Sequence, residues 1–199
     1  MTTGVTPARL ALVDEARELL LAVATTTADD AELDAVRATL ADVRERLSVG
    51  RAERMPRTPF EAPREAWQAG RPYRLSALNP FGVPLDIVFE DGKATARLVA
   101  DARHEGPPDS LHGGISAWLM DSMLGMLMQV RGRRGVTGTL DLRYVRRTPL
   151  DVPLTLRSWI SRTEGRKVWI EGSIEADGAV TVTAQGLFIE IEGAGRGSQ

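Results

Sequence analysis

The stretch that decides the fold covers residues 115–130 and reads ISAWLMDSMLGMLMQV. It is long enough for about four helical turns and is apolar on every face, so it predicts a helix buried in a core. A single acid, Asp121, interrupts it. A charged carboxylate inside a core is costly unless it has a partner, so an acid kept there is a candidate for function. The structural alternative is an Asp that only accepts hydrogen bonds from nearby backbone or from a partner subunit.

Two glycines stand directly before this helix, in His112-Gly113-Gly114. A helix N-terminus presents unpaired N–H groups and a positive dipole end, and glycines let a ligand approach the backbone closely. This is the chemistry of an oxyanion hole, in which donors point at an oxygen where negative charge develops. The alternative role of the two glycines is a tight turn from the loop into the helix.

The spacing of these two features limits how they can cooperate. Gly113 and Asp121 are eight residues apart, so along one helix they lie about 12 Å from each other. One reacting carbon cannot contact both of them. Either the two features act independently, or a two-fold dimer places Asp121 of one copy beside Gly113 of the other, which we take as a hypothesis.

The segments around the helix have the pattern of an antiparallel sheet. LDIVFE (85–90) and KATARLVA (93–100) flank Asp91-Gly92, a strong signal for a two-residue hairpin turn. After the helix we expect further strands at 137–145, 154–162, 166–175 and 179–190, with turns at Glu164-Gly165 and Asp177-Gly178. A hairpin, one apolar helix and then a meander predict an α+β fold, with the helix on one face of an antiparallel sheet.

The helix and the loop before it resemble the core motif of a known protein family. The stretch EGPPDSLHGGISAWLMDSMLG (105–125) resembles the E-G-x-P-x-x-x-H-G-G-x-x-x-x-x-x-D-x-x-x-G core of hotdog-fold acyl-CoA thioesterases of the PaaI-like, phenylacetate-degradation type. Residues 79–101 and 138–174 also resemble strands of that family, so the resemblance covers about residues 79–191. It implies a hotdog fold, an antiparallel sheet wrapped around one long central helix. It also implies an enzyme that hydrolyses an acyl-CoA to free acid and CoA as a dimer or tetramer, with no cofactor, because CoA is part of the substrate.

The resemblance assigns roles to the residues of the motif. The backbone N–H of Gly113 or Gly114 would polarise the thioester carbonyl. Asp121 of the facing subunit would act as a general base for water, or attack directly as a nucleophile. His112 would position the thioester or cap the loop. Some relatives carry Thr or Ser one turn after the acid, where this chain has Gly125. Ser122, which is next to the acid, is therefore a further candidate for positioning the water.

Three arginines, Arg143, Arg146 and Arg147, cluster near the end of a predicted strand. Arginine offers paired donors to phosphate, and the resemblance suggests that the CoA phosphates bind near this edge. The alternative is a solvated strand end in which the arginines pair with Asp141 or Asp151.

The chain before this domain divides into two parts. Residues 1–48 are expected to form a helical hairpin extension, with helices at 7–24 and 28–48. The second helix places Leu33, Val36, Leu40, Val43 and Leu47 on one apolar stripe; the pair packs on its own domain or forms a partner or oligomer surface. Residues 49–83 are expected to be a Pro/Gly-rich linker whose aromatic residues Phe60, Trp67 and Tyr73 pack on the main domain or line an acyl pocket. The hotdog domain is expected at 84–191, followed by a disordered tail at 192–199.

Composition excludes several classes of function. The net charge of −2 argues against nucleic acid as the main partner. The chain has no cysteine and two histidines, which excludes thiolate catalysis and a multi-histidine metal site, so we expect no metal. No secretory signal or membrane span is recognisable, and we expect a cytoplasmic protein.

Two other functions compete with thioester hydrolysis. One is a non-catalytic acyl-CoA sensor or interaction module that uses the N-terminal helices. The other is a hotdog hydratase acting on enoyl thioesters. Hydratases of this kind usually use an Asp together with a His that follows it in the sequence, whereas here His112 precedes Asp121 by nine residues.

Overall fold

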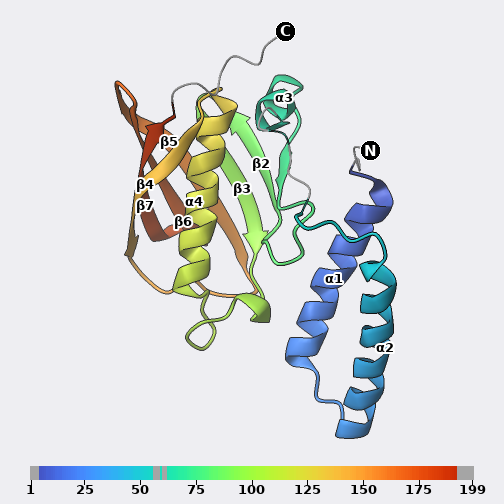
Figure 1. Ribbon diagram of the computed structural model, residues 1–199. Coiled ribbons are helices and arrows are strands. Elements are labelled where there is room, and N and C mark those ends of the chain that lie inside the picture. The colour runs from blue at the N-terminus through green and yellow to red at the C-terminus, as the bar shows by residue number, and fades with distance from the viewer. Residues whose placement is uncertain (1–4, 56–58, 60–61, 192–199) are drawn as a thin grey trace. The chain divides into compact units, whose positions relative to one another are not determined.

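The computed structural model describes residues 5–55, 59 and 62–191, and the chain divides into two units (Figure 1). The first unit is formed by residues 1–57 with 78–81, and the second by residues 58–77 with 82–199. The tail expected at 192–199 lies outside the described residues. Every candidate site residue of the sequence motif belongs to the second unit.

Two helices form most of the first unit, α1 (Pro7–Thr25) and α2 (Asp30–Ser48). The carboxylate of Asp29 caps α2 by accepting the backbone N–H of Glu32 at 3.0 Å. Such a cap satisfies one of the N–H groups that the first helical turn leaves unpaired. The two predicted helices are confirmed, with ends shifted by one or two residues.

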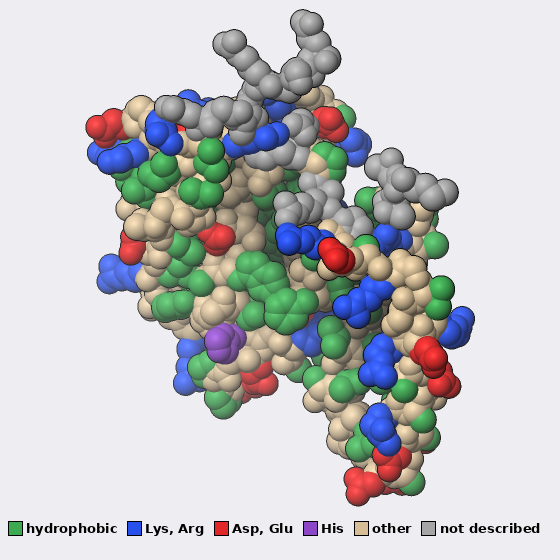
Figure 2. All heavy atoms as spheres, viewed as in Figure 1, with side chains coloured by type: hydrophobic (Ala, Val, Ile, Leu, Met, Phe, Trp, Pro, Cys, Tyr) green, Lys and Arg blue, Asp and Glu red, His purple; other side chains and the backbone are tan. Residues whose placement is uncertain are grey.

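The apolar stripe of α2 is not covered within its own unit. Leu33, Val36, Val43 and Leu47 are all exposed, and none of the described residues of α2 is buried. Figure 2 shows hydrophobic side chains on the surface of this helical unit. An uncovered apolar stripe of this kind is typical of a surface that binds another chain.

The second unit is built on an antiparallel sheet. Among the described residues it has seven strands, in the order β1-β2-β3-β5-β6-β7-β4. The predicted meander is present as β5, β6 and β7, but β4 crosses to the far edge and pairs with β7. The strands are β1 (Tyr73–Leu75), β2 (Leu85–Glu90), β3 (Lys93–Val99), β4 (Gly135–Tyr144), β5 (Pro153–Glu164), β6 (Lys167–Ala176) and β7 (Ala179–Glu190).

The tight hairpins lie where the sequence predicts them. Asp91 and Gly92 join β2 to β3 with φ of 48° and 74°, and Asp177 and Gly178 join β6 to β7 with φ of 50° and 74°. Positive φ at both turn residues matches the right-handed twist of the strands that the turn connects. These short-range turns fix the register of the hairpins.

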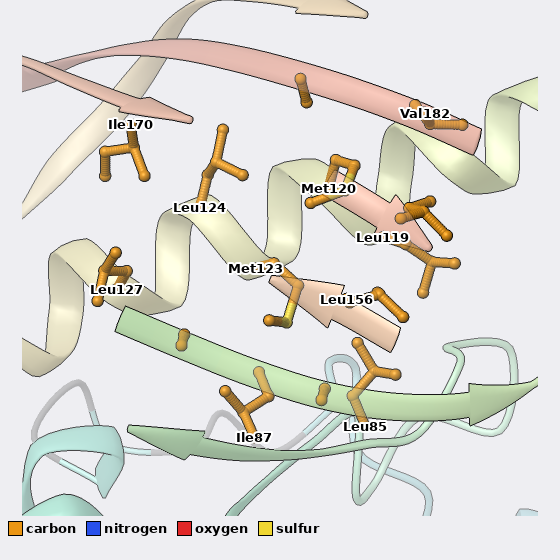
Figure 3. Packing of buried hydrophobic residues seen from close by; sticks show 14 of the residues in the cluster. Leu85, Ile87, Leu119, Met120, Met123, Leu124, Leu127, Leu156, Ile170 and Val182 are labelled. Carbon is orange, nitrogen blue, oxygen red and sulfur yellow. The ribbon is translucent and has the colours of Figure 1, made fainter. Parts of the chain in front are cut away.

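One long helix, α4 (Gly113–Val130), packs against the sheet. Its fully buried side chains include Met120, Met123, Leu124 and Leu127. Figure 3 shows these four among side chains from the strands, such as Ile170 of β6. The predicted α+β architecture, a long helix on an antiparallel sheet, is confirmed.

The expectation that α4 is buried on every face is wrong for the single chain. Asp121, Ser122 and Gly125 lie on a half-exposed side of the helix. The sheet covers only one side of α4. The apolar side chains on the other side therefore need a different neighbour to cover them. In the described chain, neither α4 nor another helix is long and apolar enough to cross a bilayer.

The Pro/Gly-rich stretch 49–83 contains regular structure that its composition did not predict. A short helix, α3 (Ala62–Gln68), and the edge strand β1 lie within it. Tyr73 packs on the core as predicted, whereas Trp67 is 41% exposed and Phe60 lies outside the described residues.

Candidate active site

The loop that leads into α4 is fixed by main-chain hydrogen bonds. The N–H of Leu111 donates to the carbonyl of Thr148 at 2.8 Å, and the N–H of His112 donates to the carbonyl of His104 at 2.8 Å. Gly106 lies so close to this segment that a Cβ there would be 2.8 Å from the Cα of His112. The start of α4 is therefore held in place before any ligand binds.

His104 has a structural role in this loop. Its Nδ1 accepts the backbone N–H of Asp101 at 3.2 Å, which caps a short helical turn, η1 (Ala102–His104). Burial lowers the pKa of His104, although the neighbouring Asp101 opposes this shift. Burial raises the pKa of Asp101, but hydrogen bonds from Arg103 outweigh it and the pKa is lowered. Within the described residues, no group of three or more His, Asp or Glu side chains could hold a metal ion.

The two glycines of the motif differ in how their N–H groups are used. The N–H of Gly114 donates to Nδ1 of His112 at 2.9 Å. The N–H of Gly113 has no acceptor in the described part of the chain. His112 thus caps the helix, which was one of its two expected roles. An imidazole whose Nδ1 accepts a hydrogen bond carries its proton on Nε2 when it is neutral, so His112 keeps a donor for another group.

Gly113, whose N–H is free, lines a cavity of about 280 Å³. The cavity is lined by the loop before α4, by the first turn of α4 and by the segment after β4, and its lining includes Leu111, Gly113, Ser116, Tyr144, Arg146 and Arg147. Apart from the two arginines, the lining is largely apolar, and a helix N-terminus contributes positive potential to it. Such a cavity suits a ligand that carries both an anionic group and an apolar part.

Two of the three candidate arginines reach this cavity, and the third does not. Arg146 and Arg147 follow β4 in a segment anchored to β7, because the N–H groups of Val145 and Arg146 both donate to the carbonyl of Thr181, at 2.8 and 3.2 Å. Arg143 instead lines a separate cavity of about 380 Å³ on the sheet face opposite α4. Side chains alternate along a strand, so Arg143 and Tyr144 point to opposite faces.

Asp121 has a partner that the sequence did not reveal. The hydroxyl of Thr137 on β4 donates to Oδ1 of Asp121 at 2.9 Å. Strand β4 has a bulge at Gly138, between Thr137 and Thr139, and this bulge changes the direction of the neighbouring side chains. The side chain of Ser122 makes no hydrogen bond in the described chain. The carboxylate is thus held at one oxygen and is open at the other.

The structure does not bring Asp121 to the Gly113 cavity. Asp121 is absent from the cavity lining, in keeping with the separation of about 12 Å expected along the helix. The single chain thus presents two half-sites on one helix: a donor site at the N-terminus of α4, and a carboxylate two turns further on.

Tyr144 is a second residue that the sequence did not reveal. Its hydroxyl donates to the carbonyl of Gly113 at 2.8 Å, across 31 residues of sequence. The hydrophobic pattern of β4 places Tyr144 on a strand, but not next to a particular turn of α4. Only the pairing of β4 with β7, which sets where the strand ends, makes this hydrogen bond possible.

Comparisons with known proteins agree with this arrangement. Residues 109–183 match the family model described as the thioesterase superfamily. Acyl-coenzyme A thioesterase THEM4 of Bos taurus is 30% identical over 111 residues, which is 53% of this chain and 46% of that protein. The chain therefore corresponds to about half the length of this curated relative.

Solved structures extend the likeness to the whole fold. Protein RHA08564, a thioesterase superfamily protein, superposes with a TM-score of 0.79 at 29% identity, over 93% of this chain and 92% of that chain. The PaaI protein of the E. coli phenylacetic acid degradation operon shares the fold with a TM-score of 0.50 at 18% identity, over 53% of this chain and 82% of that chain. The chain thus resembles the thioesterase superfamily in sequence over residues 109–183 and shares its hotdog fold.

Proposed function

We propose that this protein is an acyl-CoA thioesterase, which hydrolyses a thioester to a free acid and CoA. The observation that carries the proposal is the free N–H of Gly113, at the edge of a cavity that Arg146 and Arg147 also line. A thioester oxygen needs a hydrogen-bond donor where its charge develops, and CoA phosphates need cations. The bovine relative, whose name is acyl-coenzyme A thioesterase, supports this choice of substrate.

The acid has to come from a second copy of the chain. We infer a homodimer in which the half-exposed side of α4 meets the same side of the second copy, with the two helices antiparallel. Asp121 of one copy would then lie beside Gly113 of the other, and each dimer would have two equivalent sites. The edge strand β4 supports this inference, because most of its residues are exposed and an unpaired strand edge readily pairs with another chain.

The reaction can proceed by either of two routes. As a general base, Asp121 takes a proton from water, and the oxygen of that water attacks the thioester carbon. As a nucleophile, the carboxylate attacks the carbon itself, and water then hydrolyses the anhydride. On both routes the N–H of Gly113 stabilises the oxyanion, the C–S bond breaks, and CoA leaves as a thiolate that takes up a proton.

Thr137 would position the carboxylate on either route. Its hydroxyl occupies Oδ1 of Asp121, which leaves Oδ2 to face water or the thioester carbon. A carboxylate held by one oxygen keeps a single orientation, which is what a general base or a nucleophile needs in order to act on a fixed carbon.

A thiol-release assay over a panel of acyl-CoA substrates tests the proposal. We expect the wild-type protein to release CoA from at least one acyl class, and Asp121→Asn to lower turnover about a hundredfold or more, since an acid or base group is lost. Asp121→Asn keeps the shape of the side chain, so its thermal unfolding should match that of the wild type. Full activity in this variant would refute the role of Asp121.

The alternative function is an acyl-CoA-binding sensor or interaction module. The uncovered apolar stripe of α2 favours it, because a sensor needs a surface for a partner. Calorimetry separates the two functions: tight acyl-CoA binding without release of CoA across all acyl chain lengths would support the sensor and contradict the enzyme.

A further inference from the structure

The peptide unit between Gly113 and Gly114 is held at both of its ends by side chains. Its carbonyl accepts the hydroxyl of Tyr144 at 2.8 Å. Its N–H donates to Nδ1 of His112 at 2.9 Å. The two hydrogen bonds come from different parts of the fold: His112 immediately precedes the helix, and Tyr144 ends the edge strand β4.

The two glycines provide the room for these two side chains. A Cβ on Gly113 would lie 3.3 Å from the hydroxyl of Tyr144, and a Cβ on Gly114 would lie 3.1 Å from Nδ1 of His112. Larger residues would push away the groups that hold the peptide. The glycine pair therefore does more than give access to a ligand, because it lets both hydrogen bonds form.

A peptide between two glycines needs such restraint. Glycine has no Cβ and adopts several backbone conformations with similar ease, so a Gly-Gly peptide can rotate at low cost. Rotation of this peptide would break the cap of His112 and loosen the first turn of α4, to which Gly113 belongs. A hydrogen-bond donor stabilises a transition state only when it is already oriented.

We propose that Tyr144 is a positioning residue that, with His112, locks the Gly113–Gly114 peptide and thereby holds the first turn of α4, with the free N–H of Gly113, in place at the cavity. Tyr144 does not touch the reacting atoms in this role, which rests on the proposed thioesterase function. The edge strand β4 would then support both halves of the site, because it holds Asp121 through Thr137 and the glycine turn through Tyr144.

The test is Tyr144→Phe in the full-length protein, which keeps the aromatic ring and removes only the hydroxyl. We expect kcat to fall about tenfold with KM changed less than about twofold, because a lost orientation affects the transition state more than substrate binding. We also expect the amide hydrogen of Gly114 to exchange about tenfold faster or more, as measured by NMR. The reason is that its hydrogen bond to His112 would break more often.

A matched control is Ser161→Ala, which removes another hydroxyl that donates to a main-chain carbonyl, that of Trp169 on β6. This variant should leave both kcat and Gly114 exchange at wild-type values. Combining Tyr144→Phe with His112→Ala should cost little more than His112→Ala alone, because both side chains hold one peptide.

Two results separate this inference from the proposed function. If Tyr144→Phe behaves like Ser161→Ala in both kcat and Gly114 exchange, the positioning role of Tyr144 is wrong even though the enzyme is active. If the wild-type protein hydrolyses no thioester, the proposed function fails, and Gly114 exchange alone decides whether Tyr144 locks the peptide.

Discussion

The two ends of the candidate site, both on α4, differ in how complete they are within one chain. At Gly113 the loop, the cap of His112, the bond from Tyr144 and the two arginines of the cavity are all present. At Asp121 the chain supplies one hydroxyl, from Thr137, and a half-exposed helix side. The donor half is thus assembled by folding, whereas the carboxylate half would be completed by assembly of two copies.

The largest effect in the donor half should come from Gly113→Pro. Proline has no N–H, and it is well tolerated at the first position of a helix. His112 has φ of −61° and ψ of 132°, which suits a residue before proline. We expect kcat to fall about a hundredfold or more, the usual result of losing an oxyanion donor, as measured by thiol release.

Gly113→Ala is the control for this prediction. Alanine adds the same Cβ at 3.3 Å from the hydroxyl of Tyr144 but keeps the N–H. It should cost kcat less than about tenfold, because the donor remains. Equal losses in the two variants would mean that crowding of Tyr144, and not the missing N–H, lowers activity.

A smaller effect is expected from the arginines, and it should appear in KM. Replacing Arg146 and Arg147 together with alanine should raise KM for an acyl-CoA about tenfold with kcat nearly unchanged, because phosphate contacts bind the substrate and the transition state equally. Arg143→Ala, on the opposite face of the sheet, should change KM less than about twofold. A KM effect of similar size in Arg143→Ala would place the CoA phosphates elsewhere.

The smallest effect should come from Thr137→Val, in the carboxylate half. Valine keeps the shape of threonine and removes the hydroxyl that holds Oδ1 of Asp121. We expect kcat to fall about fivefold with KM unchanged, because Asp121 remains but its carboxylate is less well oriented. Steady-state kinetics on the acyl-CoA with the highest turnover would measure this, and an unchanged kcat would remove Thr137 from the site.

The sequence predicted those parts of the fold that depend on short-range patterns. The Asp91-Gly92 and Asp177-Gly178 turns, the long apolar helix and the two N-terminal helices each follow from residues near one another in the chain. The position of β4 at the sheet edge depends on its pairing with β7, whose partner residues come 38 to 55 positions later, and no local pattern contains this pairing. This is why Thr137 and Tyr144 were not predicted as partners of α4.

Two differences between the sequence interpretation and the structure have simple physical causes. An apolar helix was taken to be covered on all sides by its own sheet, whereas a single sheet covers one side only, so Asp121 is half exposed in the chain. Arg143 was grouped with Arg146 and Arg147 because they are close in sequence. Arg143 lies within β4 and points to the face opposite Tyr144, whereas Arg146 and Arg147 follow the end of the strand and line the cavity at Gly113.

The measurement that tests the central claim most directly is complementation between Asp121→Asn and Gly113→Pro, co-expressed and isolated as mixed dimers. In a mixed dimer, one of the two sites combines the intact Gly113 of one copy with the intact Asp121 of the other. Isolated mixed dimers should therefore have about half of wild-type activity, although each variant alone is nearly inactive. No recovery in verified mixed dimers would contradict a site shared between two copies.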